Sequence, residues 1–128
     1  MNKDFFNWAK QKNKIHEDKI RAYFNEREVW FASLGANVGY EQDGRGKRYL
    51  RPIIVVKKFN NEVLWCIPLT KNNKIQRYYF ALNINNNTST AILTQLRLID
   101  AKRLQYKIGN ISEKAFSEIK EKIKQLFA

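Results

Sequence analysis

A basic, glycine-containing segment is the part of this sequence best suited to chemistry. Residues 39–52 lie between two apolar segments, 29–32 and 53–56, and they contain three glycines. Four cations fall within seven positions of this segment: Arg45, Lys47, Arg48 and Arg51. Glycine permits backbone angles that other residues resist, so such a loop can approach a polyanion closely and hold positive charge against it. The plainer alternative is a solvated basic loop without a ligand.

Arg51 is the strongest candidate for chemistry in this loop. Its guanidinium can donate two parallel, charge-assisted hydrogen bonds to a phosphate, and it stays charged at every working pH. Pro52 restricts the direction in which Arg51 points. Such a group can stabilise the charge that builds on a phosphate when the 2′-hydroxyl of RNA attacks it. The alternative is an arginine at a strand edge that keeps a sheet soluble.

The other ionisable residues predict neither a metal site nor a cofactor. His16 is the only histidine and Cys66 the only cysteine, so the histidine and cysteine clusters of zinc sites are absent from the sequence. Glu41 and Asp43 could in principle hold Mg²⁺, but the neighbouring cations would repel it. Cys66 lies in an apolar segment, where we expect a small buried hydrophobe rather than a nucleophile. The sequence therefore predicts chemistry that needs no metal.

The charge of the chain indicates a polyanionic partner. The sequence has 24 Lys and Arg against 12 Asp and Glu, which gives a net charge of +12 and a pI of about 9.9. Residues 29–111 carry 13 of these cations and only 4 anions, so the middle of the chain holds most of the excess. A surface that is merely soluble mixes both signs. Nucleic acid is therefore the expected partner.

Length and hydropathy predict one domain in the cytoplasm. A chain of 128 residues with 44% hydrophobic content can build a single packed core. Its sequence has no run of about eighteen apolar residues, which a membrane span needs, and its first residues lack a signal-peptide core. We therefore expect a cytoplasmic protein that does not act at a membrane.

Short apolar segments separated by turn residues predict a mainly β domain. Strands are expected at residues 29–32, 52–57, 63–67, 77–82, 90–93 running on toward Leu98, and 104–108. Asn60-Asn61 and residues 85–87 are expected to form turns, since Asn tolerates left-handed backbone angles. A helical turn is expected at residues 100–103 and a kink at Gly109. This many short strands favours a bent sheet that curls into a partly open barrel.

Helices are expected at both ends of the chain, which makes the predicted class α+β. Residues 4–24 mix apolar and charged side chains, with Asp4 as an N-cap, and predict one or two short helices in an N-terminal arm over residues 1–27. The domain proper is then expected over residues 28–128. Ser112 should cap a C-terminal helix with one apolar face, formed by Phe116, Ile119, Ile123 and Leu126.

The order of several short motifs resembles the MazF/PemK family of toxin endoribonucleases. A Gly-x-Glu-Gln loop followed by Arg-Pro is present as Gly39, Glu41, Gln42 and Arg51-Pro52. Pro-Leu-Thr (68–70), Gln-x-Arg-x-x-Asp (95–100), Arg103-Leu104 and Lys107-Ile108-Gly109 then follow in the family's order. Each motif is weak alone, but five in the right order are a strong signal, and the resemblance covers roughly residues 28 to 127. The connection between Gln42 and Arg51 is longer than the short one usual in the family.

This resemblance implies a fold, partners and an activity. The implied fold is the SH3-like partly open barrel of MazF, CcdB and Kid. The implied assembly is a homodimer with an RNA groove across both subunits, held in check by a cognate antitoxin protein. The implied activity is metal-independent, sequence-specific cleavage of single-stranded RNA such as mRNA by the toxin of a type II toxin-antitoxin system.

The resemblance also implies roles for individual residues. Arg51 and Thr70 match the family's catalytic arginine and threonine, although Thr70 could instead be a strand-terminal cap. PemK-like members have acid and base residues where this chain has Tyr40, Ile92 and Thr94, so the mechanism should follow the Arg/Thr subgroup. Candidates for the general base or for support of the site are Glu41, Gln42 and Gln95. Candidates for RNA contacts are Tyr40, Arg45, Lys47, Arg48, Tyr49 and Lys71, with Trp30 as either a stacking or a core residue.

Two other functions fit parts of the same pattern. A non-catalytic SH3-like nucleic-acid-binding module would need only the basic loop and its aromatic residues. A toxin that poisons gyrase on the same barrel would bind a protein target instead of RNA. Cleavage of pure RNA in the presence of a chelator distinguishes the enzyme from both alternatives.

Overall fold

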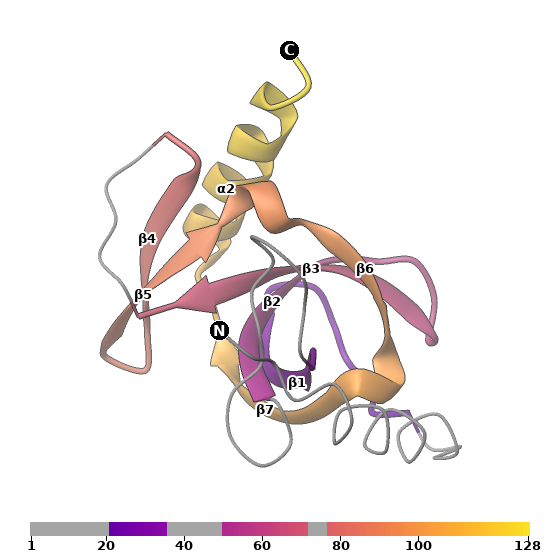
Figure 1. The fold of residues 1–128 in the computed structure, drawn as a ribbon. Helices are drawn as coiled ribbons and strands as arrows, with labels where there is room; N and C mark the ends of the chain where they lie inside the picture. Colours follow the sequence, from indigo (N-terminus) through magenta and orange to yellow (C-terminus); the bar gives the residue numbers. More distant parts are fainter. Residues whose placement is uncertain (1–20, 36–49, 72–76) are drawn as a thin grey trace, which may run out of the picture.

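A strongly bent, seven-stranded antiparallel sheet forms the body of the protein (Figure 1). The computed structural model describes residues 21–35, 50–71 and 77–128. Its strands are β1 (Glu28–Ser33), β2 (Leu50–Lys58), β3 (Val63–Thr70), β4 (Tyr79–Ile84), β5 (Asn87–Ile92), β6 (Arg97–Asp100) and β7 (Leu104–Asn110). The sheet order is β4-β5-β3-β2-β1-β7, and β6 pairs with β3. This arrangement confirms the predicted mainly β barrel.

The barrel is open between β6 and β7, because these consecutive strands do not pair with each other. These strands pair with β3 and β1, respectively, and the short 3₁₀ helix η2 (Ala101–Arg103) connects them. The Asp100 side chain caps η2 by accepting a hydrogen bond from Lys102 N at 2.8 Å. The helical turn predicted at residues 100–103 is therefore confirmed.

The sheet buries apolar side chains on both faces. Its inner face is packed with buried residues such as Trp30, Ile53, Val55, Leu64 and Cys66. Its outer face is covered by α2 (Glu113–Gln125) and by the β4–β5 hairpin. Strand β2 is buried on both faces, so its sequence reads as a nearly continuous apolar run instead of an alternating one.

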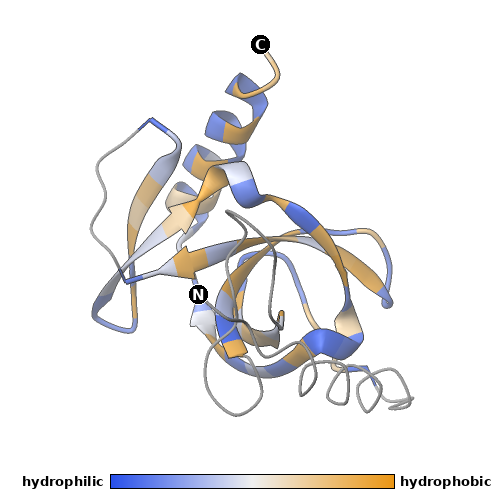
Figure 2. Ribbon diagram, viewed as in Figure 1, coloured by the Kyte–Doolittle hydropathy of each residue, from blue (hydrophilic) through white to orange (hydrophobic). Residues whose placement is uncertain are grey.

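The C-terminal helix begins as predicted. Ser112 Oγ accepts a hydrogen bond from Ala115 N at 3.1 Å, which satisfies an otherwise unpaired amide of the first turn. Phe116, Ile119 and Ile123 are buried against the outer face, and apolar and polar residues alternate around the helix in Figure 2. Leu126 was predicted on the same face, but α2 ends at Gln125 and Leu126 is 37% exposed.

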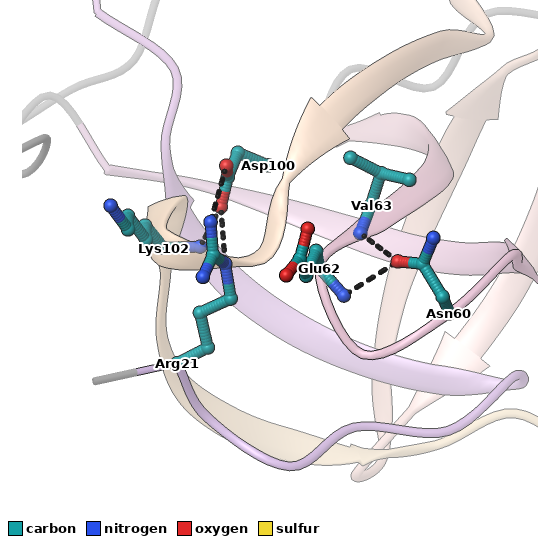
Figure 3. Close-up of polar contacts among 6 residues, drawn as sticks. All are labelled: Arg21, Asn60, Glu62, Val63, Asp100 and Lys102. Carbon is teal, nitrogen blue, oxygen red and sulfur yellow. Dashed lines mark hydrogen bonds and ion pairs between the residues drawn. The ribbon is translucent and has the colours of Figure 1, made fainter. Parts of the chain in front are cut away.

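The two predicted asparagine turns are built differently. Asn85 and Asn86 have φ values of 50° and 66°, so the turn between β4 and β5 uses left-handed backbone angles as predicted. Asn60 is not among the described residues with positive φ. Its side-chain oxygen instead accepts hydrogen bonds from Glu62 N at 2.7 Å and Val63 N at 2.9 Å (Figure 3). The turn was therefore predicted correctly, but for the wrong reason. The side-chain oxygen of Asn60 accepts the hydrogen bonds that a backbone carbonyl accepts in an ordinary turn.

The strand predicted from residue 90 toward Leu98 is interrupted. Residues 87–92 form β5 and residues 97–100 form β6, with the 3₁₀ helix η1 (Leu93–Gln95) between them. Both strands lie along the same edge of β3, since Leu69 pairs with Ala91 and Cys66 with Arg97. The apolar run Ala91-Ile92-Leu93 continues from β5 into the first residue of η1, and a sequence pattern cannot distinguish the end of a strand there from one continuous strand.

Two smaller predictions also need correction. The fourth strand was expected at residues 77–82 but is β4, Tyr79–Ile84, two residues later. Gly109 was expected to kink the chain, but it lies within β7, and the register with β1 skips Ile108 instead. A β-bulge therefore bends this strand, because one extra residue opposes its partner.

Residues 21–27, the described part of the predicted N-terminal arm, contain no helix. The helix predicted over residues 4–24 does not include residues 21–24, and residues 1–20 lie outside the described part of the chain. Arg21 donates to both carboxylate oxygens of Asp100, at 3.0 and 3.1 Å (Figure 3). Phe24 is fully buried. No helix among the described residues is long and apolar enough to cross a membrane.

Candidate active site

Arg51 and Thr70 come from different strands and line one pocket. The pairing of β2 with β3 ends where Ile53 lies opposite Pro68. Two residues beyond this pair on each strand, the same register would place Arg51 opposite Thr70. Thr70 is instead held by β5, where it pairs with Thr90. A pocket of about 370 Å³ lies where the β2–β3 ladder has ended, and its lining consists of Phe31, Leu50, Arg51, Pro52, Leu69, Thr70, Lys71 and Ser89.

Arg51 is a buried residue of an interior strand. β2 pairs with β1 on one side and β3 on the other, and Arg51 itself is the partner of Ala32. Only 6% of Arg51 is exposed. An arginine that keeps a sheet edge soluble would be exposed on an edge strand, so the structure contradicts that alternative. Its position beside a pocket fits a cation that meets a ligand.

Thr70 and Lys71 stand at the rim of the same pocket. Thr70 ends β3 and is half-buried, and Lys71 follows it as an exposed residue. The structure therefore brings the residues Arg51, Thr70 and Lys71 together around one space. A hydrogen-bond donor, a guanidinium and a mobile point charge are the groups that bind a phosphodiester.

An adjoining pocket extends this site into a groove. This second pocket, of about 390 Å³, shares Phe31, Pro52, Leu69, Lys71 and Ser89 with the first. It continues along the sheet to Val29, Ile84, Asn87, Thr88 and Ile108. The groove thus has an apolar floor with hydroxyl and amide groups of β5 at its side, a composition suited to unpaired bases.

Sequence reasoning missed the residues of β5 and Phe31. Residues 87–90 read Asn-Thr-Ser-Thr, a polar run followed by the apolar Ala91 and Ile92. A polar run at the start of a strand was a usable signal for a functional surface. Phe31 lies next to Trp30 in an apolar strand, so the sequence alone does not reveal that it lines the groove.

Several predicted residues lie elsewhere. Trp30 is 7% exposed and donates from Nε1 to Glu28 Oε1 at 3.0 Å, so it is a core residue rather than a base-stacking one. Gln95 is half-buried in η1 and does not line either pocket. The other predicted site residues lie outside the described residues: Tyr40, Glu41, Gln42, Arg45, Lys47, Arg48 and Tyr49.

Cys66 is excluded as a nucleophile by its surroundings. It is fully buried on the inner face of the barrel. Burial raises the pKa of its thiol to about 12, with Arg97 and Arg103 acting weakly in the opposite direction. The thiol is therefore protonated at neutral pH, as expected for a small core residue. Among residues 21–35, 50–71 and 77–128, no three His, Cys, Asp or Glu residues cluster as metal ligands would.

Comparison with known proteins connects this geometry to a family. The family model described as "PemK-like, MazF-like toxin of type II toxin-antitoxin system" matches residues 25–127. No curated protein matches the chain.

Several solved structures share this fold, and three of them illustrate the similarity. MazF from Deinococcus radiodurans superposes with a TM-score of 0.64 at 15% identity, covering 83% of this chain and 98% of that one. Mycobacterium tuberculosis toxin MazF-mt6 gives 0.61 at 16% identity, covering 79% and 96%. An endoribonuclease from Mycobacterial species, in complex with its cognate antitoxin, gives 0.63 at 12% identity, covering 82% and 95%.

These similarities confirm the resemblance seen in the motifs and the barrel that it implies. The matched region contains every described residue of the groove, including Arg51 and Thr70. The chain belongs to the PemK-like, MazF-like family of toxins from type II toxin-antitoxin systems.

Proposed function

We propose that this chain is a metal-independent endoribonuclease that cleaves single-stranded RNA at specific sequences, as the toxin of a type II toxin-antitoxin system in the cytoplasm. The observation that carries the proposal is the meeting of Arg51 and Thr70 at one pocket, at the end of a groove with an apolar floor. The shared fold of the mycobacterial endoribonuclease supports the reaction class.

In the proposed reaction, the 2′-hydroxyl attacks the adjacent phosphorus and the bond to the 5′-oxygen breaks. The products are a 2′,3′-cyclic phosphate and a 5′-hydroxyl, so the attacking oxygen loses a proton and the leaving oxygen gains one. The Arg51 guanidinium stabilises the charge on the phosphoryl oxygens, and the Thr70 hydroxyl donates a hydrogen bond to the same phosphate. Glu41, Gln42 and Gln95 are the proposed candidates for the general base or for support of the site.

The groove accounts for the preference for single strands and for sequence. Bases of a duplex are stacked and paired, whereas a splayed base can lie on an apolar floor and present its edges. Ser89 and Thr88 offer hydroxyl groups and Asn87 an amide at the side of this groove. Hydrogen-bonding groups of this kind discriminate between base edges, which is the physical basis of the proposed specificity.

The decisive experiment uses a defined RNA that contains every short sequence, incubated with pure protein and excess EDTA. We expect discrete fragments with cyclic phosphate and 5′-hydroxyl ends. A matched RNA with a 2′-deoxy nucleotide at each mapped site should bind but stay intact. Fragments with 5′-phosphate ends would overturn the mechanism. Protection of the RNA without cleavage would favour the non-catalytic module, and intact RNA with gyrase-dependent DNA breaks would favour the gyrase toxin.

The proposed partners are a second copy of this chain and an antitoxin. A fold neighbour was solved with its cognate antitoxin, which supports the second of these. Because residues 29–111 are strongly basic, an acidic segment of the antitoxin should compete with RNA, and the complex should weaken as salt rises. An affinity that does not depend on salt would contradict this mode of inhibition. Light scattering should give the mass of a homodimer, and a monomeric mass would overturn that assignment.

A further inference from the structure

An exposed aromatic side chain lies beside the groove and contacts its lining. Tyr106 of β7 is 51% exposed, and the centroid of its ring lies 4.9 Å from that of Phe31, with an angle of 37° between the ring planes. Phe31 lines both pockets of the groove. The aromatic surface that begins in the groove at Phe31 therefore continues outward onto Tyr106.

Strand pairing places Tyr106 on the face of the sheet that carries the groove. Phe31 lies between two Cα partners, Tyr106 on β7 and Pro52 on β2, and residues opposite each other in a sheet share a face. Pro52 lines both pockets, as Phe31 does, and Ile108 of β7 lines the second pocket. The groove therefore already reaches β7, and Tyr106 is its next aromatic neighbour on that strand.

The backbone of β7 is irregular on both sides of Tyr106. The register with β1 skips Gln105 before it and Ile108 after it. Bulges of this kind increase the local twist, re-aim side chains and are frequent next to active sites. The contact with Phe31 also restricts the Tyr106 ring before a ligand binds, and a side chain with two rotatable bonds has little entropy left to lose. Tyr106 is thus a preorganised and accessible ring.

The chemistry of this surface favours a nucleobase as its ligand. Every base has a flat π-face that stacks on an aromatic ring, whatever its sequence. The groove next to Tyr106 combines an apolar floor with the hydroxyl and amide groups of β5, which suits unpaired bases. Residues 29–111 carry 13 cations and 4 anions, so a polyanion is drawn to this part of the chain.

We propose that Tyr106 is a stacking subsite that holds one unpaired base of the RNA immediately outside the groove. The proposal rests on the proposed function, because the ligand is the same RNA that is cleaved in the groove. Stacking tolerates every base, so this subsite adds affinity, whereas the polar groups of the groove select the sequence. Tyr106 binds the substrate and takes no part in the chemical step.

The first test compares RNA binding by Tyr106→Ala and by the wild type. The RNA carries 2′-deoxy at the cleaved nucleotide, and binding is measured over a series of salt concentrations, with a thermal melt to check folding. We expect affinity to fall about tenfold, while the slope of log K against log salt stays unchanged because no cation is lost. KM should rise with little change in kcat, since stacking is present before and during the reaction.

Three further variants control for the loss of the ring. Tyr106→Leu retains an apolar contact for Phe31 but removes the π-face, so its affinity should fall as in Tyr106→Ala. Tyr106→Phe keeps the ring and should bind as the wild type does. Phe59→Ala is the matched control, because exposed Phe59 forms a ring pair with Trp65 at 5.0 Å and neither residue lines the groove. It should keep the wild-type affinity.

The second test replaces one base of the RNA at a time with an abasic nucleotide. At one position near the cleaved bond, the replacement should weaken binding to the wild type about tenfold and leave binding to Tyr106→Ala unchanged. Ring and base form one contact, so losing both costs no more than losing either. Every other replacement should weaken both proteins by the same factor. If all positions behave alike in the two proteins, no base stacks on Tyr106.

The outcomes separate this proposal from the proposed function. If the wild-type protein neither binds nor cleaves RNA, both fail. If it does both and Tyr106→Ala has the wild-type affinity, only the stacking subsite is overturned. A monomeric mass for Tyr106→Ala, where the wild type is a dimer, would assign the ring to the subunit interface instead. A loss of antitoxin binding with unchanged RNA binding would assign it to the antitoxin, and the stacking subsite would again be wrong.

Discussion

Glu28 in β1 and Arg51 in the neighbouring strand β2 are both buried charged residues. They lie near opposite ends of this strand pair, and their surroundings differ. Glu28 is 8% exposed at the start of β1, and Arg51 is 6% exposed opposite Ala32 near its end. The carboxylate of Glu28 accepts from Trp30 Nε1 and Asn25 N and forms an ion pair with Lys107 at 3.1 Å. Arg51 lines a pocket of about 370 Å³.

This difference teaches how to separate structural from functional buried charge. A buried ion is stable when hydrogen bonds and an opposite charge replace the water that it has lost, as around Glu28. A buried charge that also lines a cavity is, in addition, positioned to meet a ligand, as proposed for Arg51. Removing Glu28 should therefore affect mainly stability, and removing Arg51 should affect mainly catalysis.

The largest expected effect is that of Arg51→Ala. Loss of a charge-assisted contact to the transition state should raise the barrier by about 3 kcal/mol or more, a hundredfold or greater loss of kcat. Lysine at this position should rescue poorly, since it cannot form two parallel hydrogen bonds. Single-turnover cleavage measures the change, with a thermal melt as the control for folding. An Arg51→Ala protein with wild-type activity would remove Arg51 from the mechanism.

Thr70→Val should have the next largest effect. Valine keeps the shape of threonine but removes the hydroxyl that donates to the phosphate, so kcat should fall about tenfold to a hundredfold. Thr70→Ser should retain most activity. Thr90→Val is the matched control, because Thr90 is the Cα partner of Thr70 but lines neither pocket. Equal losses of kcat in the two valine variants would show that the Thr70 hydroxyl has no special role.

Glu28→Gln should lower stability while leaving kcat unchanged. Burial disfavours the charged carboxylate, but hydrogen bonds from Trp30 and Asn25 and the nearby Lys107 outweigh it and lower the pKa of Glu28. Loss of the negative charge should reduce the free energy of unfolding by about 1–2 kcal/mol at pH 7, as measured by urea denaturation. A loss of kcat in fully folded Glu28→Gln protein would contradict the comparison with Arg51.

The contribution of Glu28 should also depend on pH in a defined direction. A carboxyl with a folded pKa below its unfolded value binds fewer protons in the folded state, so its stabilisation is present above the unfolded value of 4.5. The stability difference between wild type and Glu28→Gln should then shrink as pH falls below 4.5 and through the lower folded pKa. A difference that grows on acidification would show that the charged carboxylate does not stabilise the fold.

The smallest effect is expected for Cys66→Ala. Removing one buried sulfur leaves a small cavity, so the free energy of unfolding should fall by about 1 kcal/mol with kcat unchanged. In the native wild-type protein, a thiol reagent should react only as fast as the barrel opens, because the thiol is buried and its pKa is raised to about 12. Rapid alkylation that abolishes cleavage would place Cys66 near the reaction after all.

The sequence was sufficient for most elements because their signals are local. Ser112 and the spacing of Phe116, Ile119 and Ile123 define the start and buried face of α2 within a few residues of each other. The two catalytic candidates were also predictable, since Arg51-Pro52 and the end of the Pro-Leu-Thr motif are recognisable by order alone. The failures occurred where an element depends on a distant partner, as in the division of residues 87–100 into β5 and β6 along one edge of β3.

By itself the sequence determined the basic character of the chain and the β-strand and helix periodicity, and it singled out Arg51 and Thr70 as the catalytic candidates. Only the tertiary structure decided that the β2–β3 ladder ends at Pro68, that Thr70 is held by β5, and that a pocket lies between Arg51 and Thr70. It alone also brought Arg103 to Ser33, 70 residues earlier in the chain. Secondary-structure propensity and charge depend on residues that are neighbours in the sequence. Strand register and the contacts between side chains depend instead on how segments distant in the sequence bury their apolar faces together.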